Sequence, residues 1–198
     1  MPNNAYNPRR DITAIILAGG VSSRMGHDKA LLPWQGRPFV EHIVECLRAQ
    51  VDRIAINTNT PADFAQLGLP LIADPTAERC GPLAGIMAAL NYSSTALTLV
   101  VPCDNPLLSP QLVTRMLAAL EGEQTDLAYA FSNGDSHYLY ALMRSDLRDN
   151  LSVFLRAHDY AVRRWYATLR TSRIDFSDQA EHFCNINSAE ELTLLRPR

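Results

Sequence analysis

The chain has 198 residues, of which 47% are hydrophobic and 20% charged, and its formal net charge at pH 7 is −3. This length favours one domain, and the hydrophobic content is enough for a buried core, which excludes a disordered protein. The negative charge argues against general electrostatic binding to nucleic acids, and no apolar run approaches the roughly 20 residues that cross a bilayer. The first ten residues lack the apolar segment of a signal peptide, so we expect a cytoplasmic protein with no membrane or nucleic-acid partner.

Apolar spacing predicts alternating strands and helices along the chain. Residues 12–18 form a continuous apolar run rich in β-branched side chains, as in a strand buried on both faces. Helical spacing at 38–50 is followed by strands at 53–57 and 69–73, with a short helix at 62–67 between them. Next come a helix at 81–90, a strand at 97–101 and a helix that Ser109 caps with Pro110 in its first position. The remaining expected elements are strands at 127–131 and 138–143 around a hairpin turn, helices at 145–158 and 160–169, a strand at 172–176 and a helix from Ser188.

This alternation predicts right-handed crossover connections and therefore an α/β domain with a mostly parallel sheet. We expect residues 1–10 to form a flexible N-terminal tail and residues 11–198 to form the single domain. The four cysteines are widely spaced, which is typical of reduced, buried thiols and not of a zinc site.

Polar residues follow four of the predicted strands where each strand ends. They are Gly19-Gly20, Asn57 (in Asn57-Thr58-Asn59), Asp74 and Asp104. In open α/β sheets ligands bind beyond the carboxyl ends of the strands, and this set suits a polyanion with a divalent metal. Each residue alone also has a structural interpretation, because Gly, Asn and Asp are common turn formers.

The loop after the first strand, Leu17-Ala-Gly-Gly-Val-Ser-Ser-Arg-Met-Gly-His-Asp-Lys29, has the composition of a phosphate-binding loop. It matches neither the P-loop nor the dinucleotide-binding pattern of glycines. Its glycines nevertheless permit close approach of backbone amides to phosphate oxygens, and Arg24 and Lys29 add positive charge. Lys29 is the only lysine among 18 basic residues, which favours a position that requires a compact ammonium group.

The motif Leu-Ala-Gly-Gly-x-Ser-x-Arg-Met-Gly-x-Asp-Lys resembles the first loop of nucleotidyltransferases related to the sugar-phosphate pyrophosphorylases. Together with Gly81-Pro-Leu-Ala-Gly85, Pro102-Cys-Asp-Asn-Pro106 and Asn185-Ile-Asn-Ser-Ala-Glu-Glu-Leu192, it most resembles the bacterial molybdenum cofactor guanylyltransferase family. The resemblance implies a Rossmann-like three-layer domain with a mixed sheet, as in nucleotide-diphospho-sugar transferases. It also implies transfer of GMP from Mg²⁺-bound GTP to the terminal phosphate of the molybdenum-molybdopterin cofactor, with release of pyrophosphate.

The resemblance also implies roles for individual residues. Leu17, Ala18, Gly19, Lys29, Asn57, Asp74 and Asp104 match GTP-binding positions, and Asp104 also matches the Mg²⁺ ligand. Arg24 and Lys29 are expected to offset charge on the departing pyrophosphate, and Asn185 and Asn187 to lie on the cofactor side of the cleft. Tyr138 departs from the family, which often has proline there in the segment associated with pterin binding. Expected partners are other molybdenum cofactor biosynthesis proteins and the apo-molybdoenzymes.

Three alternatives to this function remain open. The same transfer from CTP would use a similar loop, since the residues alone do not identify the base. A sugar-1-phosphate nucleotidyltransferase would be unusually short at 198 residues. A nucleotide-binding protein without catalytic activity would not need both Lys29 and Asp104. For individual motifs, Ser188 and Glu191 also fit a helix capping box, and Trp34, Trp165 and Tyr166 fit core packing better than a pterin-binding surface.

Overall fold

The structure is a computed structural model, and it describes residues 9, 11–19, 29–75, 80–122 and 124–183. Of the predicted tail at 1–10, only Arg9 belongs to these residues. Arg9 donates a hydrogen bond of 2.9 Å to the carbonyl of Arg48 and lies 3.8 Å from Asp52.

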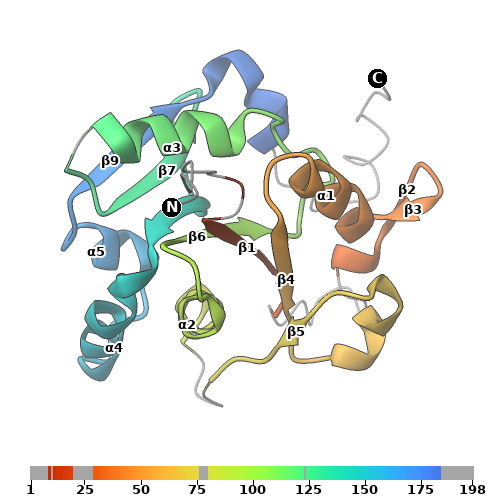
Figure 1. The fold of residues 1–198 in the computed structure, drawn as a ribbon, viewed down its shortest axis with the longest axis horizontal. Coiled ribbons are helices and arrows are strands. Elements are labelled where there is room, and N and C mark those ends of the chain that lie inside the picture. Colours follow the sequence, from red (N-terminus) through yellow and green to blue (C-terminus); the bar gives the residue numbers. More distant parts are fainter. Residues whose placement is uncertain (1–8, 10, 20–28, 76–79, 123, 184–198) are drawn as a thin grey trace, which may run out of the picture.

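Seven strands form one mixed sheet in the order β5-β4-β1-β6-β8-β7-β9 (Figure 1). Their bounds are β1 (Ile12–Leu17), β4 (Arg53–Asn57), β5 (Leu71–Ile72), β6 (Leu97–Pro102), β7 (Leu127–Ser132), β8 (Asp135–Arg144) and β9 (Thr171–Asp175). Strand β8 is antiparallel to both of its neighbours, whereas all other adjacent pairs are parallel. The predicted α/β class with a mostly parallel, mixed sheet is therefore confirmed.

Helices cover both faces of the sheet and make a three-layer fold. They are α1 (Phe39–Arg48), α2 (Pro82–Tyr92), α3 (Leu112–Gly122), α4 (Arg148–Arg156) and α5 (Val162–Tyr166). Helices α1 and α3 lie on one side of the sheet, and α2 and α4 lie on the other (Figure 1). Side chains of α1 and α3 pack in one hydrophobic cluster, and side chains of α2, α4 and α5 pack in a second. In β1, Ile12, Ala14 and Ile16 belong to the first cluster and Ile15 to the second, because successive side chains of a strand point to opposite faces.

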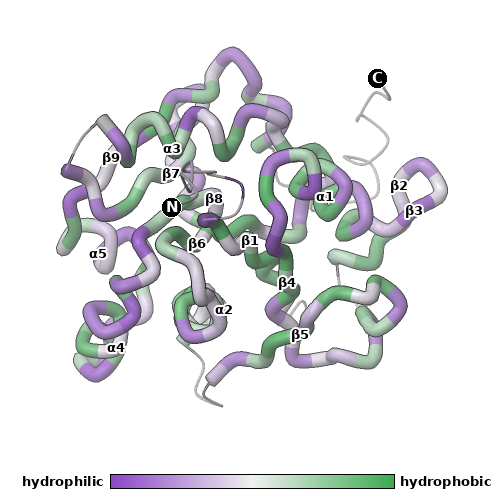
Figure 2. The backbone as a smooth tube through the Cα atoms, viewed as in Figure 1, coloured by the Kyte–Doolittle hydropathy of each residue, from purple (hydrophilic) through white to green (hydrophobic). Residues whose placement is uncertain are grey.

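The distribution of hydropathy agrees with this layering. Hydrophobic residues gather along β1 and β4 in the middle of the molecule, and hydrophilic residues are frequent at the peripheral hairpin of β2 (Pro33–Trp34) and β3 (Arg37–Pro38) (Figure 2). Trp165 and Tyr166 are buried in the cluster beside α2, which confirms that they serve core packing.

Several boundaries differ from the sequence prediction. The β2–β3 hairpin was not predicted; Gln35 and Gly36, at φ values of 49° and 80°, form its turn. Strand β5 is shorter than the predicted 69–73, because Pro70 has no N–H to donate and contributes only its carbonyl, to the amide of Ile56. Helix α3 begins at Leu112, although the Ser109 hydroxyl does accept the Gln111 amide at 3.2 Å.

The predicted β7–β8 hairpin is confirmed, with Asn133 and Gly134 at φ values of 49° and 98° in its turn. This pair of positive φ values is the reason why Asn-Gly is a strong hairpin sequence. Short 3-10 helices occupy Lys29–Leu31, Pro61–Leu67, Ser145–Leu147 and Ser177–Phe183. The helix predicted from Ser188 lies outside the described residues.

Candidate active site

The candidate site lies at the carboxyl ends of the parallel strands, as the sequence predicted. Leu17 at the end of β1 is in register with Asn57 of β4 on one side and with Pro102 of β6 on the other. The amide of Ala18 continues this pairing with a 2.8 Å hydrogen bond to the carbonyl of Asn57. The turn after β1 is therefore held between Asn57 and the segment that leads to Asp104.

Asn57 and Asp74 form one hydrogen-bonded unit. The Asn57 side chain is 1% exposed, and its Nδ2 donates to Asp74 Oδ1 at 2.9 Å and to the carbonyl of Ile72 at 3.3 Å. Because both of these neighbours are acceptors, they fix which end of the amide is nitrogen. Asn57 Oδ1 consequently points the other way, toward the backbones of Gly19 and Gly85.

Gly19 and Gly85 leave the space that the Asn57 amide occupies. A Cβ atom added to Gly85 would lie 2.6 Å from Asn57 Oδ1 and 3.1 Å from Leu17 Cδ2, and one added to Gly19 would lie 3.1 Å from Asn57 Oδ1. The first of these distances is too short for any side chain to be accepted without movement. The two glycines therefore allow helix α2 and the β1 turn to approach the amide closely.

Asn59 is a member of this network that the sequence analysis did not assign. Its Nδ2 donates to Asp74 Oδ2 at 2.9 Å and to the carbonyl of Gly19 at 3.4 Å, and its Oδ1 accepts the Asp74 amide at 3.2 Å. The available signal was the Asn57-Thr58-Asn59 spacing, since residues two apart at a strand end point to the same side.

Asp104 follows β6 and carries a buried carboxylate oxygen. Its Oδ1 has no hydrogen-bond partner among the residues that the structure describes. Burial raises the pKa of the Asp104 carboxyl above its ordinary value, while its own backbone amide and the charge of Lys29 act in the opposite direction. The structure thus places Lys29, in the 3-10 helix Lys29–Leu31, within electrostatic reach of Asp104.

A buried carboxylate oxygen without a donor is suited to a hard cation such as Mg²⁺. A cation there would compensate the desolvation of Asp104. Within the described ranges, no group of three or more His, Cys, Asp or Glu side chains forms a metal site. A single carboxylate such as that of Asp104 nevertheless fits Mg²⁺, which commonly binds one or two carboxylates and takes its other ligands from water and substrate phosphates.

Neighbouring residues hold the segment that carries Asp104. Asn105 is 1% exposed; its Oδ1 accepts the Leu107 amide at 2.8 Å, and its Nδ2 donates to the Glu181 carbonyl at 3.5 Å. The loop after β6 is therefore attached to the 3-10 helix Ser177–Phe183, far along the chain.

Only some of the residues predicted to lie on the side of the acceptor substrate are described. Asn185 and Asn187, which are expected on this side, lie outside the described residues, as does Arg24, which is expected beside the departing pyrophosphate. Tyr138 lies in β8, where its carbonyl accepts the Tyr166 hydroxyl at 2.8 Å and its ring packs 5.2 Å from the ring of Tyr129. At the position where the family often has proline, this chain therefore has an aromatic side chain within a cluster of three tyrosines.

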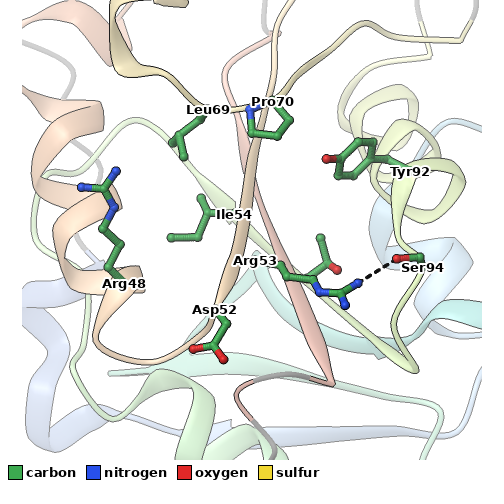
Figure 3. Close-up of a pocket in the computed structure, with 9 residues that line it drawn as sticks. Arg48, Asp52, Arg53, Ile54, Leu69, Pro70, Tyr92 and Ser94 are labelled. Carbon is green, nitrogen blue, oxygen red and sulfur yellow. Dashed lines mark hydrogen bonds between the residues drawn. The ribbon is translucent and has the colours of Figure 1, made fainter.

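A separate hollow of about 540 Å³ lies at the opposite end of the sheet. Figure 3 shows it beside the start of β4, with Arg48, Arg53, Ile54 and Tyr92 among its lining side chains. Because Arg53 begins β4 and Asn57 ends it, this hollow is distinct from the candidate site.

The described part of the chain contains no helix long and apolar enough to span a membrane.

Comparisons with known proteins identify the family to which the chain belongs. Residues 14–174 match the family model of the MobA-like NTP transferase domain. A molybdenum cofactor guanylyltransferase from Shewanella sediminis is 40% identical over 182 residues, which cover 91% of this chain and 93% of that protein. The corresponding protein from Burkholderia ambifaria is 38% identical over 203 residues, covering 97% and 98% of the two chains.

Solved structures show the same fold at low sequence identity. Molybdopterin-guanine dinucleotide biosynthesis protein A from Archaeoglobus fulgidus superposes with a TM-score of 0.75 at 19% identity, covering 91% of this chain and 95% of that one. A 4-diphosphocytidyl-2C-methyl-D-erythritol synthase from Anaerococcus prevotii gives 0.70 at 12% identity, covering 93% and 95%. The chain belongs to the molybdenum cofactor guanylyltransferase family of nucleotidyltransferases.

Proposed function

We propose that this chain transfers GMP from GTP to the terminal phosphate of the molybdenum-molybdopterin cofactor. An oxygen of that phosphate attacks the α-phosphorus of GTP in line, a new P–O–P bond forms, and the bond to the β-phosphate breaks with release of pyrophosphate. The observation that carries this proposal is the buried Asp104 Oδ1, which has no hydrogen-bond donor among the described residues and lies at the carboxyl edge of the sheet, where the charge of Lys29 acts on it. The names of the relatives support the choice of both substrates.

The chain's own residues account for binding and charge stabilisation. Lys29 is the cation whose charge acts on the Asp104 carboxylate. In the proposed reaction its ammonium group contacts the β- and γ-phosphates. Asp104 would hold Mg²⁺, which when bound neutralises phosphate charge and polarises the α-phosphate. No nucleophilic side chain is needed, because positioning and electrostatics supply catalysis in phosphoryl-group chemistry of this kind. Arg24 would add a second cation beside the leaving group.

The Asn57–Asp74 unit supports guanine as the base. It presents the Asp74 carboxylate as an acceptor, and the buried Asn57 amide holds that carboxylate in place. The guanine edge offers two neighbouring donor groups, N1–H and the 2-amino group, whereas the corresponding edge of cytosine has one amino donor beside acceptors. We therefore propose that this unit prefers GTP to CTP.

Pyrophosphate release tests the reaction and the base together. The purified chain is incubated with Mg²⁺, the molybdenum-molybdopterin cofactor and GTP, CTP, ATP or ITP in turn. We expect release with GTP, much less with CTP or ATP, and a weaker response to ITP, which lacks the 2-amino group. Release with CTP at or above the GTP rate would assign the cytidylyl transfer instead.

The product would pass to apo-molybdoenzymes, and other proteins of molybdenum cofactor biosynthesis would deliver the acceptor. The net charge of −3 is consistent with partners that are proteins and small molecules and not nucleic acid.

A further inference from the structure

We infer that Asn59 is a positioning residue, which acts on the nucleotide through Asp74 and the turn at Gly19. This inference rests on the proposed function, since it concerns the same nucleotide site. It adds a residue to that site whose contribution comes from holding a carboxylate in one orientation.

The first argument is the number and kind of contacts that one amide makes. Asn59 binds Asp74 at two points, donating to its carboxylate at 2.9 Å and accepting its backbone N–H at 3.2 Å. A side-chain amide can make both contacts at once, because it carries a donor and an acceptor side by side. The pair of contacts fixes the rotation of the Asp74 side chain relative to its own backbone.

The second argument concerns the third contact, from Asn59 Nδ2 to the carbonyl of Gly19 at 3.4 Å. Gly19 is separated from Asn59 by 40 residues and Asp74 by 15. An asparagine that served only to form a turn would bond to backbone groups two residues away. Asn59 instead joins two segments that both line the nucleotide site.

The third argument is that Asn57 completes the restraint from the other side. Asn57 donates to Asp74 Oδ1, and Asn59 donates to Asp74 Oδ2, so that each carboxylate oxygen already accepts one N–H. Each oxygen retains acceptor capacity for a donor of the nucleotide. Because Asn57 is buried and Asn59 is exposed, a change at Asn59 disturbs this orientation with little effect on the core.

The test compares Asn59→Asp with Asn59→Ser in the full-length chain. Aspartate lacks donors and places a second negative charge beside Asp74, whereas serine keeps a hydroxyl that can both donate and accept. Gln66→Glu is the matched control, since it makes the same amide-to-carboxylate change at an exposed residue that bonds within its own 3-10 helix.

We expect Asn59→Asp to weaken GTP binding, measured by calorimetry without the acceptor, about 10- to 100-fold. In turnover, Asn59→Asp should raise the KM for GTP by a similar factor and change kcat less. Asn59→Ser should recover part of the lost affinity. Gln66→Glu should bind GTP as the wild type does. The melting temperatures of the unliganded proteins should remain close to that of the wild type.

A double-mutant cycle decides whether Asn59 acts through Asp74. In an Asp74→Ala background, Asn59→Asp should cost clearly less affinity than in the wild type, because the carboxylate that it holds is absent and only its contact to Gly19 remains to be lost. Additive losses, or unchanged GTP affinity in Asn59→Asp, would overturn the inference while leaving the proposed function intact. A wild-type chain that binds GTP but releases no pyrophosphate with any nucleotide would instead refute the proposed function alone, and a wild-type chain that does not bind GTP would overturn both.

Discussion

Replacing Gly85 with alanine measures how closely helix α2 packs against the Asn57 amide. In a helix interior this substitution ordinarily stabilises a protein by about 0.5–1 kcal/mol, because alanine loses less backbone entropy on folding. Here the new Cβ would lie 2.6 Å from Asn57 Oδ1. The amide is buried and bonded at its nitrogen end, so it has to turn away and give up its contacts to Asp74 and Ile72.

The magnitude follows from those two hydrogen bonds. The one to the Asp74 carboxylate is worth about 1.5–3 kcal/mol, and the one to the Ile72 carbonyl about 0.5–1.5 kcal/mol. Subtracting the gain in helix propensity leaves a net loss of about 1–4 kcal/mol in the free energy of unfolding. GTP affinity should fall as well, since Asp74 loses one of the two amides that orient it.

Urea denaturation and GTP titration of Gly85→Ala check both effects. Asn91→Ala, at an exposed position of the same helix, serves as the control and should be slightly more stable than the wild type. A Gly85→Ala variant that is as stable as the wild type and binds GTP equally well would refute the steric argument.

Two further predictions concern the charged groups. Because burial raises the pKa of Asp104, its ionised form opposes folding; Asp104→Asn should therefore unfold at higher urea than the wild type at pH 7 without Mg²⁺. This difference should disappear below the ordinary carboxyl pKa of about 4, and turnover with Mg²⁺ should fall steeply; a variant less stable than the wild type at pH 7 would contradict this reasoning. Lys29→Ala should lower kcat on the order of 10²–10³, with Lys29→Arg recovering only part, because the planar guanidinium does not replace a compact ammonium. Arg156→Ala, at an exposed position of α4, is the control. Wild-type turnover in Lys29→Arg would contradict the predicted contact of Lys29 with the phosphates and indicate a surface cation.

Those parts of the fold that depend on local sequence were predictable. The apolar, β-branched run at residues 12–18 predicted the buried strand β1, and the Asn133-Gly134 pair predicted the hairpin of β7 and β8. The insertion of β8 between β6 and β7 was not readable, because strand order depends on contacts between distant segments. The β2–β3 hairpin was missed because two-residue strands are too short to show a period.

Some residues of the candidate site could be predicted from the sequence, and others could not. Asn57, Asp74 and Asp104 were identified because each follows a strand, and the topology of parallel sheets brings such positions together. The role of Asn59 depends on partners 15 and 40 residues away, and the importance of Gly85 depends on a 2.6 Å distance across two elements. The local sequence shows both residues, in Asn57-Thr58-Asn59 and in Gly81-Pro-Leu-Ala-Gly85, but it does not show these distant contacts.

The central position of β1 also has a consequence for how the chain folds during synthesis. β1 is the first strand to be made, yet it pairs with β6, whose first residue, Leu97, lies opposite Ile12. Until the ribosome has made that distant segment, one edge of this mostly apolar strand has no native neighbour. Pairings this far apart in sequence form slowly. β7 and β8, by contrast, are joined by a tight turn and can pair as soon as they emerge. The nascent chain therefore carries a strand with an open edge until β6 has been made, and nascent-chain chaperones would find a binding site at β1.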